Sequence, residues 1–146
     1  MKLLIQRVKK ASVTIDDVLY SKIGHGLLVF IGVEKGDEKE NARFLADKIS
    51  KLRIFEDEQG KMNKSVVETG GEILVVSQFT LAGDCKKGTR PSFDKAEIPQ
   101  KAKELYEYFT ELLRKMNIKN VRTGVFGAMM EVELINDGPV TFMIEK

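Results

Sequence analysis

The sequence predicts a single α/β or α+β domain with mixed, curled β-sheets and two main helices. Three observations support this prediction. The 146 residues match the commonest size of one compact domain, and no repeat or linker divides them. Apolar, β-branched runs indicate many strands, whereas only two segments have helical spacing. Strands and helices do not alternate regularly, which argues against a doubly wound nucleotide-binding fold.

The N-terminal third is expected to form strands. Apolar side chains dominate its first stretch, and the next stretch alternates apolar and polar residues, as in a half-buried strand. The pair Asp16-Asp17 predicts a tight turn. A later unbroken run of apolar residues indicates a strand covered on both faces. In order, the expected strands are residues 3–8, 11–15, 18–23 and 27–33.

The first helix is expected directly after these strands. Asp37 is the predicted N-cap, and Glu40, three residues later, fits a capping box. Apolar residues from Phe44 to Leu52 then recur with helical spacing. Residues 53–55 are expected to form a short strand that runs into a loop at 56–61.

The C-terminal half contains one clear helix between strands. Residues 73–76 indicate a buried strand, and residues 82–99 form a loop rich in Gly, Lys, Asp and Pro. Pro99 suits the first turn of a helix whose apolar residues share one face as far as Met116. The strands expected after it are 121–122, 130–135 and 140–144, with a turn at 136–139.

Composition limits the possible classes of function. The net charge of +2 is too small to indicate a nucleic-acid-binding domain by itself. Lys86, Lys87 and Arg90 cluster beside glycines, although a solvated loop also explains this cluster. No apolar run is long enough to cross a bilayer, the N-terminus does not resemble a signal peptide, and Cys85 is the only cysteine. We therefore expect a cytoplasmic protein with no membrane segment and no disulfide.

The common catalytic side-chain sets are missing. His25, the only histidine, lies in a Gly-His-Gly turn, where we expect a surface position. One histidine and one cysteine do not make a usual zinc site, and no glycine-rich phosphate motif is present. The sequence therefore predicts neither a metal nor a cofactor.

Two polar segments remain as candidates for a site. Ser77, Gln78 and Thr80 follow a buried strand, at the place where sheets often bind ligands, and Phe79 adds an aromatic wall. A purely structural role explains such a strand end as well. Residues 136–139, Asn-Asp-Gly-Pro, fit an ordinary turn, but their proline stands directly before a strand, where proline is restricted.

Together these segments resemble the D-aminoacyl-tRNA deacylase family over nearly the whole chain. The two signature motifs around Ser77 and Pro139 show no departure from the family pattern. The resemblance adds the expectation of barrel-like, layered sheets with both helices packed on one side, in a single domain 1–146. In order, the matching motifs are QRV at 6–8, ASV at 11–13, GLLV at 26–29, LRIF at 52–55, GKMN at 60–63, SQFTL at 77–81, KGTRPSF at 87–93 and NDGPVT at 136–141.

The resemblance implies a homodimer whose active sites lie at the subunit interface. The Gly138–Pro139 bond is expected to be cis and to enter the partner's pocket, with Arg7 holding the motif in place. An L-amino acid would push its side chain into this backbone, whereas a D-amino acid would point outward. Glycine, which has no side chain, would escape this filter.

Roles for the first motif follow from the same resemblance. Gln78 and Phe79, with their backbone amides, are expected to bind the ester carbonyl and the terminal adenosine, and Ser77 belongs to the same catalytic motif. Thr80 is expected to be a hydrogen-bonding group of the pocket rather than a nucleophile, because no base is evident beside it.

Two further groups of residues receive roles from the resemblance. Phe126, Ala128 and Met130 are expected to shape the adenine site, although plain core packing explains them equally well. The acceptor-stem phosphates of tRNA are expected near Lys86, Lys87 and Arg90.

The resemblance thus implies an enzyme that hydrolyses the ester of D-aminoacyl-tRNA with help from the tRNA 2′-hydroxyl. Two other functions stay open. One is a non-catalytic aminoacyl-tRNA or RNA binder that uses the same pocket. The other is a hydrolase with Ser77 or Thr80 as its nucleophile.

Overall fold

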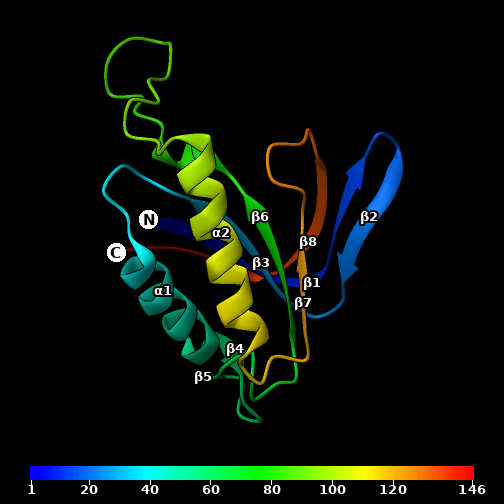
Figure 1. The fold of residues 1–146 in the computed structure, drawn as a ribbon. Helices are drawn as coiled ribbons and strands as arrows, with labels where there is room; N and C mark the ends of the chain where they lie inside the picture. Colours follow the sequence, from blue (N-terminus) through cyan, green and yellow to red (C-terminus); the bar gives the residue numbers. More distant parts are fainter.

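The longest strand, β1, organises the sheet in the computed structural model, which describes all residues from 1 to 146 (Figure 1). β1 (Lys2–Ile15) pairs antiparallel with β3 (Gly26–Gly32) through its first half and with β2 (Val18–Ile23) through its second half. β8 (Glu131–Glu145) runs antiparallel along the other edge of β1. The two strands expected at 3–8 and 11–15 are therefore one continuous strand.

The other half of the sheet is parallel. β6 (Glu72–Ser77) lies beside β3, and β7 (Asn120–Thr123) lies beside β6, which completes a six-stranded sheet. The sheet curls until β2 approaches β7, where the Ser21 hydroxyl donates a hydrogen bond to the Thr123 carbonyl (2.9 Å). This nearly closed sheet confirms the expected barrel-like, mixed architecture. The carboxyl ends of β3, β6 and β7 all reach the same edge.

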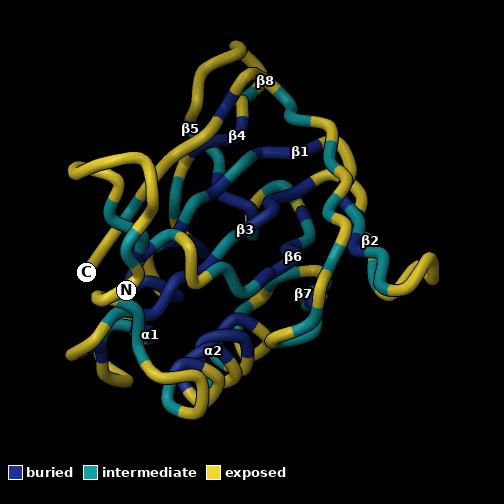
Figure 2. The backbone as a smooth tube through the Cα atoms, turned by 90° about the horizontal axis from the view of Figure 1, so that it is seen from above, coloured by how far each residue is buried: buried dark blue, intermediate teal, exposed yellow.

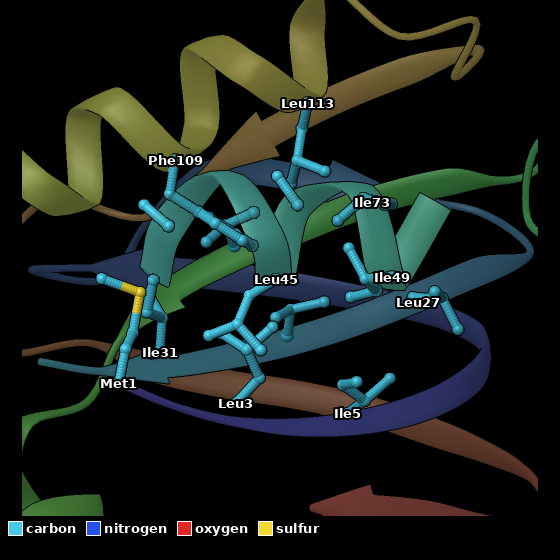
Figure 3. Close-up of a cluster of buried hydrophobic side chains, with 14 of the residues drawn as sticks. Met1, Leu3, Ile5, Leu27, Ile31, Leu45, Ile49, Ile73, Phe109 and Leu113 are labelled. Carbon is cyan, nitrogen blue, oxygen red and sulfur yellow. The ribbon is translucent and has the colours of Figure 1, made fainter. Parts of the chain in front are cut away.

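Both helices cover one face of the sheet, as expected (Figure 1). α1 (Lys39–Lys51) and α2 (Pro99–Arg114) pack beside each other, and Pro99 occupies the first turn of α2. Between them and the sheet lies a core of 21 buried residues. Figure 3 shows Leu45 and Ile49 of α1 and Phe109 and Leu113 of α2 above apolar side chains of the strands.

A second, smaller core fills the inside of the curl. β3 and β6 are buried on both faces, because the first core covers one side and the second core covers the other; Figure 2 shows both strands largely in the buried colour. The alternation of side chains along each strand assigns neighbouring residues to opposite cores. The seven buried members of the second core are Val8, Ala11, Val13, Ile23, Leu28, Leu74 and Val76.

The prediction that Asp37 caps α1 is wrong. The N-cap is Glu38, whose backbone N–H donates to the side chain of Asn41 (2.9 Å). Asp37 is buried instead, and its carboxylate accepts hydrogen bonds from the Met1 ammonium (2.5 Å) and the Glu34 backbone N–H (2.6 Å). Local propensity favours Asp over Glu at a cap, but the distant ammonium binds this aspartate.

The short strand expected at 53–55 is displaced toward the C-terminus. The structure has β4 (Phe55–Glu56), which pairs antiparallel with β5 (Met62–Lys64). Neither α1 nor α2 has the length and hydropathy that a membrane-spanning helix needs.

The prediction of a turn between two strands at residues 136–139 is also wrong. β8 continues through this segment, and both of its halves pair with β1. Asn136 lies opposite Val8 and Thr141 lies opposite Gln6, so residues 137–140 form a bulge opposite Arg7 alone. Turn-forming residues here extrude the backbone from a strand without reversing it.

Candidate active site

The motif that begins with Ser77 lies at the carboxyl end of β6. Ser77 is the last residue of the strand, opposite Ile31 of β3, and the Gln78 backbone N–H donates to the Ile31 carbonyl (2.8 Å). A single 3₁₀ turn, η1 (Phe79–Ala82), follows and crosses the end of β3. A side chain at Gly32 would collide with this turn, since its Cβ would stand 2.9 Å from Cβ of Leu81.

The side chains of this motif face outward. Phe79 is 58% exposed, and its ring packs edge-on against Phe93 with 5.1 Å between the centroids. The Thr80 hydroxyl is exposed and accepts a hydrogen bond from the Gln78 side-chain amide. No carboxylate or histidine contacts that hydroxyl, so the motif lacks the base that a threonine nucleophile requires.

The segment that contains Phe126, Ala128 and Met130 lies next to this motif, at the carboxyl end of β7. The Gly124 backbone N–H bonds the Val75 carbonyl of β6 (2.9 Å), which fixes the start of the segment. Phe126 packs near Tyr106 against the larger core, while Met130 packs against the smaller one. Core packing therefore explains Phe126 and Met130, and all three residues remain partly exposed beside the strand ends.

The bulge in β8 is closed by the side chain of Asn136. Its amide donates to the Val140 carbonyl (3.0 Å) and to the Gln6 side chain (2.9 Å), and its oxygen accepts from the Val140 N–H (2.9 Å). The Gly138–Pro139 bond is cis, as the resemblance implies, and both residues are exposed. A Cβ on Gly138 would stand 2.3 Å from the Val140 nitrogen, so only glycine fits this bulge.

Arg7 holds the bulge from beneath. Its buried guanidinium donates to the carbonyls of Asp137 (2.9 Å) and Ile54 (2.8 Å). The same group lies 3.3 Å from the Asp137 carboxylate and 3.5 Å from that of Glu56. One side chain from β1 thus connects the β8 bulge to β4, which agrees with the positioning role that the resemblance gives Arg7.

His25 is exposed, as its turn predicted, and it also belongs to this cluster. Its Nε2 lies 3.8 Å from the Asp137 carboxylate, and its ring packs edge-on against buried Phe55. Together with Arg7 and Glu56 these residues line a small cavity of about 210 Å³ beneath the bulge. The flanking glycines gave no signal for this placement, because the contacts come from β4 and β8.

The two motifs do not meet within one chain. The bulge lies beside Arg7, which pairs with Leu27, whereas Ser77 pairs with Ile31, at the opposite end of β3. That difference in register amounts to about 13 Å along the strands. The three strand spacings from β6 through β3 and β1 to β8 add about 14 Å across the sheet. Within one chain the two motifs therefore lie at separate places on the sheet.

The basic cluster lies on a loop that extends away from the body of the molecule between η1 and α2 (Figure 1). Asp84 and Ser92 close its base through paired backbone hydrogen bonds of 2.8 and 3.0 Å. Lys86, Lys87 and Arg90 lie beyond this base and are exposed. Phe93 directly follows the base, so the loop begins beside Phe79 of the strand-end motif.

Relatives of known name share this sequence along its length. The D-aminoacyl-tRNA deacylase of Geobacillus sp. is 57% identical over 99% of this chain and 95% of its own. The enzyme of the same name from Thermotoga petrophila is 55% identical over 99% of this chain and 97% of its own.

Solved structures share the fold. A c-Myc DNA Unwinding Element Binding Protein superposes with a TM-score of 0.95 at 42% identity, covering 100% of this chain and 99% of that one. A probable eukaryotic D-amino acid tRNA deacylase superposes with a TM-score of 0.83 over 99% and 98% of the two chains; at 18% identity this shows the fold alone. The family described as D-Tyr-tRNA(Tyr) deacylase matches residues 4–145, and the chain belongs to that family.

Proposed function

We propose that this protein hydrolyses the ester bond of D-aminoacyl-tRNA and releases tRNA and the free D-amino acid. Membership of the deacylase family supports this class of ester hydrolase. The observation that carries the proposal is the separation of the Ser77 and Gly138 motifs, each exposed and each incomplete alone. The protein acts as a homodimer in which Gly138 and Pro139 of one subunit enter the strand-end pocket of the other.

Hydrolysis in this pocket relies on positioning. Gln78 and Phe79, with their backbone amides, hold the ester carbonyl, while Ser77 and Thr80 supply hydrogen bonds around it. Water adds to the carbonyl carbon, the bond to the ribose 3′ oxygen breaks, and that oxygen takes up a proton with help from the neighbouring 2′-hydroxyl. The exposed, base-free Thr80 hydroxyl is consistent with this role.

Backbone atoms provide the chiral filter. The Gly138 and Pro139 backbone occupies the space that the side chain of an L-amino acid would need, and D side chains point into open space. Rejection by backbone treats all L-amino acids alike, whatever their side chains. Glycyl-tRNA has no side chain to reject, so it is hydrolysed as well.

The remaining substrate contacts are peripheral to the ester. The partly exposed Phe126, Ala128 and Met130 shape the adenine site, and Lys86, Lys87 and Arg90 contact acceptor-stem phosphates. A cytoplasmic location suits such a substrate. Phosphate contacts make the affinity for tRNA fall with rising salt.

Paired deacylation of D- and L-tyrosyl-tRNA, without added metal, tests the proposal. Fast loss of the D-ester with survival of the L-ester is the expected result. Survival of both esters while tRNA remains bound would contradict it. Thr80→Ala is expected to lower the single-turnover rate only modestly, whereas near-complete loss of the chemical step would show that Thr80 is a nucleophile.

A second candidate function is nucleic-acid binding without catalysis. The 42% identical solved structure is named a c-Myc DNA Unwinding Element Binding Protein, and this name favours nucleic-acid binding. A double-stranded DNA fragment that bound more tightly than tRNA, in a protein that left both esters intact, would make this the better description.

A further inference from the structure

A hollow of about 450 Å³ lies between the start of β1 and the base of the loop that follows η1. Three lysines line it: Lys2 from β1, Lys86 from the loop, and Lys95 from the segment before α2. Asp84 is the only carboxylate in the lining. The wall is therefore mainly cationic, and only Lys86 among these lysines has been given a role above.

The charges around the hollow do not cancel. Lys2 pairs with Glu34 (2.9 Å), and Lys95 lies 3.9 Å from Asp84, whereas Lys86 has no carboxylate partner. The Lys86 backbone N–H lowers the pKa of Asp84, and the hydrogen bond that Lys2 donates to Glu34 raises the pKa of Lys2, so these groups stay ionised at neutral pH. Within the lining itself three ammonium groups face one carboxylate, while Glu34, Glu145 and Asp37 act on Lys2 from outside it.

The hollow adjoins the proposed ester site. Its wall includes Ala82, the last residue of η1, and Gly83, whose N–H bonds the Thr80 carbonyl (2.9 Å). One turn of backbone therefore separates the hollow from the motif that holds the ester. A strand of nucleic acid whose terminal ribose lay at Thr80 would carry its nearest phosphates past this wall.

We propose that the hollow formed by Lys2, Lys86 and Lys95 binds a single phosphodiester of the substrate's 3′-terminal strand. The lining has more ammonium groups than carboxylates, which suits the negative charge of a phosphodiester. The nucleic-acid origin of that phosphate rests on the proposed function, whereas its capture by the three lysines does not. Lys87 and Arg90, which lie outside the hollow, have no part in this site.

Two ligands that differ only in charge test the site without any catalysis. The dinucleotide CpA carries one charged phosphodiester, and its methylphosphonate analogue replaces a charged oxygen by a neutral methyl group. The wild-type dimer should bind CpA about tenfold more tightly than the analogue at low salt, the effect of one charge-assisted contact. Lys86→Gln should reduce that ratio to about twofold, and Lys95→Gln should lower it as well.

Control variants define the outcomes. Lys119→Gln removes an equal charge next to the start of β7, far from the hollow, and should keep the wild-type ratio. A ratio near one for the wild-type protein, or an equal loss in Lys87→Gln and Lys86→Gln, would overturn the site. Inorganic phosphate that displaced CpA at equal concentration would overturn its assignment to a nucleic-acid strand. Hydrolysis of D-tyrosyl-tRNA, measured in parallel, judges the proposed function separately.

Discussion

At the scale of single residues, the buried side chain of Arg7 connects β1 both to β4 and to the bulge in β8. A guanidinium presents several donors in a fixed plane, so one buried group reaches the carbonyls of Asp137 and Ile54 and approaches the carboxylate of Glu56. The bulge that carries Gly138 therefore depends on a side chain from β1. Lysine has the same charge but cannot make these contacts simultaneously.

We expect Arg7→Lys to lower stability by about 2 kcal/mol and the rate of D-tyrosyl-tRNA hydrolysis by about tenfold or more. The loss arises because one ammonium cannot satisfy both buried carbonyls, which frees the bulge to move. Denaturant unfolding and single-turnover deacylation measure the two effects.

Arg53→Lys is the matched control for this change. The Arg53 Nε also donates to a backbone carbonyl, that of Asn63 (2.7 Å), but the side chain is exposed. Its replacement should change stability by about 0.5 kcal/mol or less. Equal effects in both variants would show that the network beneath the bulge has no special role.

At this scale the family resemblance predicted what the residues alone did not, and contacts with distant partners were missed. The cis bond at Gly138–Pro139 was expected from the resemblance, whereas the four residues by themselves fitted an ordinary turn. Asp37 was misplaced, and the contact of the exposed His25 with Asp137 was missed, since the partners of both residues are brought to them only by the folded sheet. A turn residue and a cap residue look ordinary until those neighbours are known.

At the scale of elements, the parallel pairing of β3 and β6 depends on close backbone approach at Gly26. A Cβ at this position would stand 1.9 Å from the Glu72 carbonyl oxygen, which no relaxation of a side chain can relieve. Gly26 faces Glu72 at the first step of the ladder, so the clash would push the two strands apart.

We expect Gly26→Ala to lower the free energy of unfolding by about 3 kcal/mol or more, as overpacking against rigid backbone does. Gly24→Ala is its control, because a Cβ there would meet its nearest neighbour at 3.6 Å, an ordinary contact. Urea denaturation of the two variants measures the difference in stability. Similar unfolding midpoints would contradict the backbone clash at Gly26.

Helix α2 carries a buried hydroxyl whose titration should be visible at high pH. Burial raises the pKa of Tyr106 to about 12, and its hydroxyl donates to the Val75 carbonyl (3.1 Å). Because the unfolded chain releases this proton first, near pH 10, the protonated hydroxyl favours the folded state. That contribution is complete below pH 10 and disappears as the pH rises through about 12.

Alkaline unfolding of wild type and Tyr106→Phe isolates this contribution. Their difference in stability should shift by up to about 2 kcal/mol between pH 9 and pH 12, with the wild type losing more. At pH 7 the variant should cost only about 1 kcal/mol, since the Val75 carbonyl keeps the Gly124 N–H as a partner. A pH-independent difference would contradict the raised pKa.

The elements themselves were largely predictable, and their ends were less so. Apolar patterns located both helices and all of the core strands, because the helices bury one apolar face and strands such as β3 and β6 are continuous apolar runs buried on both faces. Residues 136–139 were mistaken for a reversing turn, since a bulge and a turn use the same residues. Only the pairing of both halves of β8 with β1 distinguishes the two.

At the scale of the whole molecule, the position of the site follows from topology. The parallel strands bring the Ser77 motif to one edge, while the bulge in β8 projects far from that edge. No sequence pattern reports this separation, which becomes visible only in the register of the sheet. The proposed composite site between two subunits would bring both motifs to one ester.

Mixing two inactive variants tests the composite site directly. Gln78→Ala/Thr80→Ala damages the pocket, and Gly138→Ala displaces the bulge, since its Cβ would stand 2.3 Å from the Val140 nitrogen. In a dimer of one copy of each, one site combines both defects and the other is intact. With random exchange about half of the dimers are mixed, so about a quarter of the wild-type activity should return.

A second mixture of variants serves as the control and shows where the recovered activity comes from. Gln78→Ala/Thr80→Ala mixed with Phe79→Ala places a defect in every pocket, so no intact site forms and no recovery beyond the separate variants is expected. The baseline for both mixtures is the summed activity of the two separate proteins. Recovery above this baseline in the first mixture alone would require that each active site contain one motif from each subunit. Absence of recovery after confirmed subunit exchange would instead place both motifs of each active site within one chain.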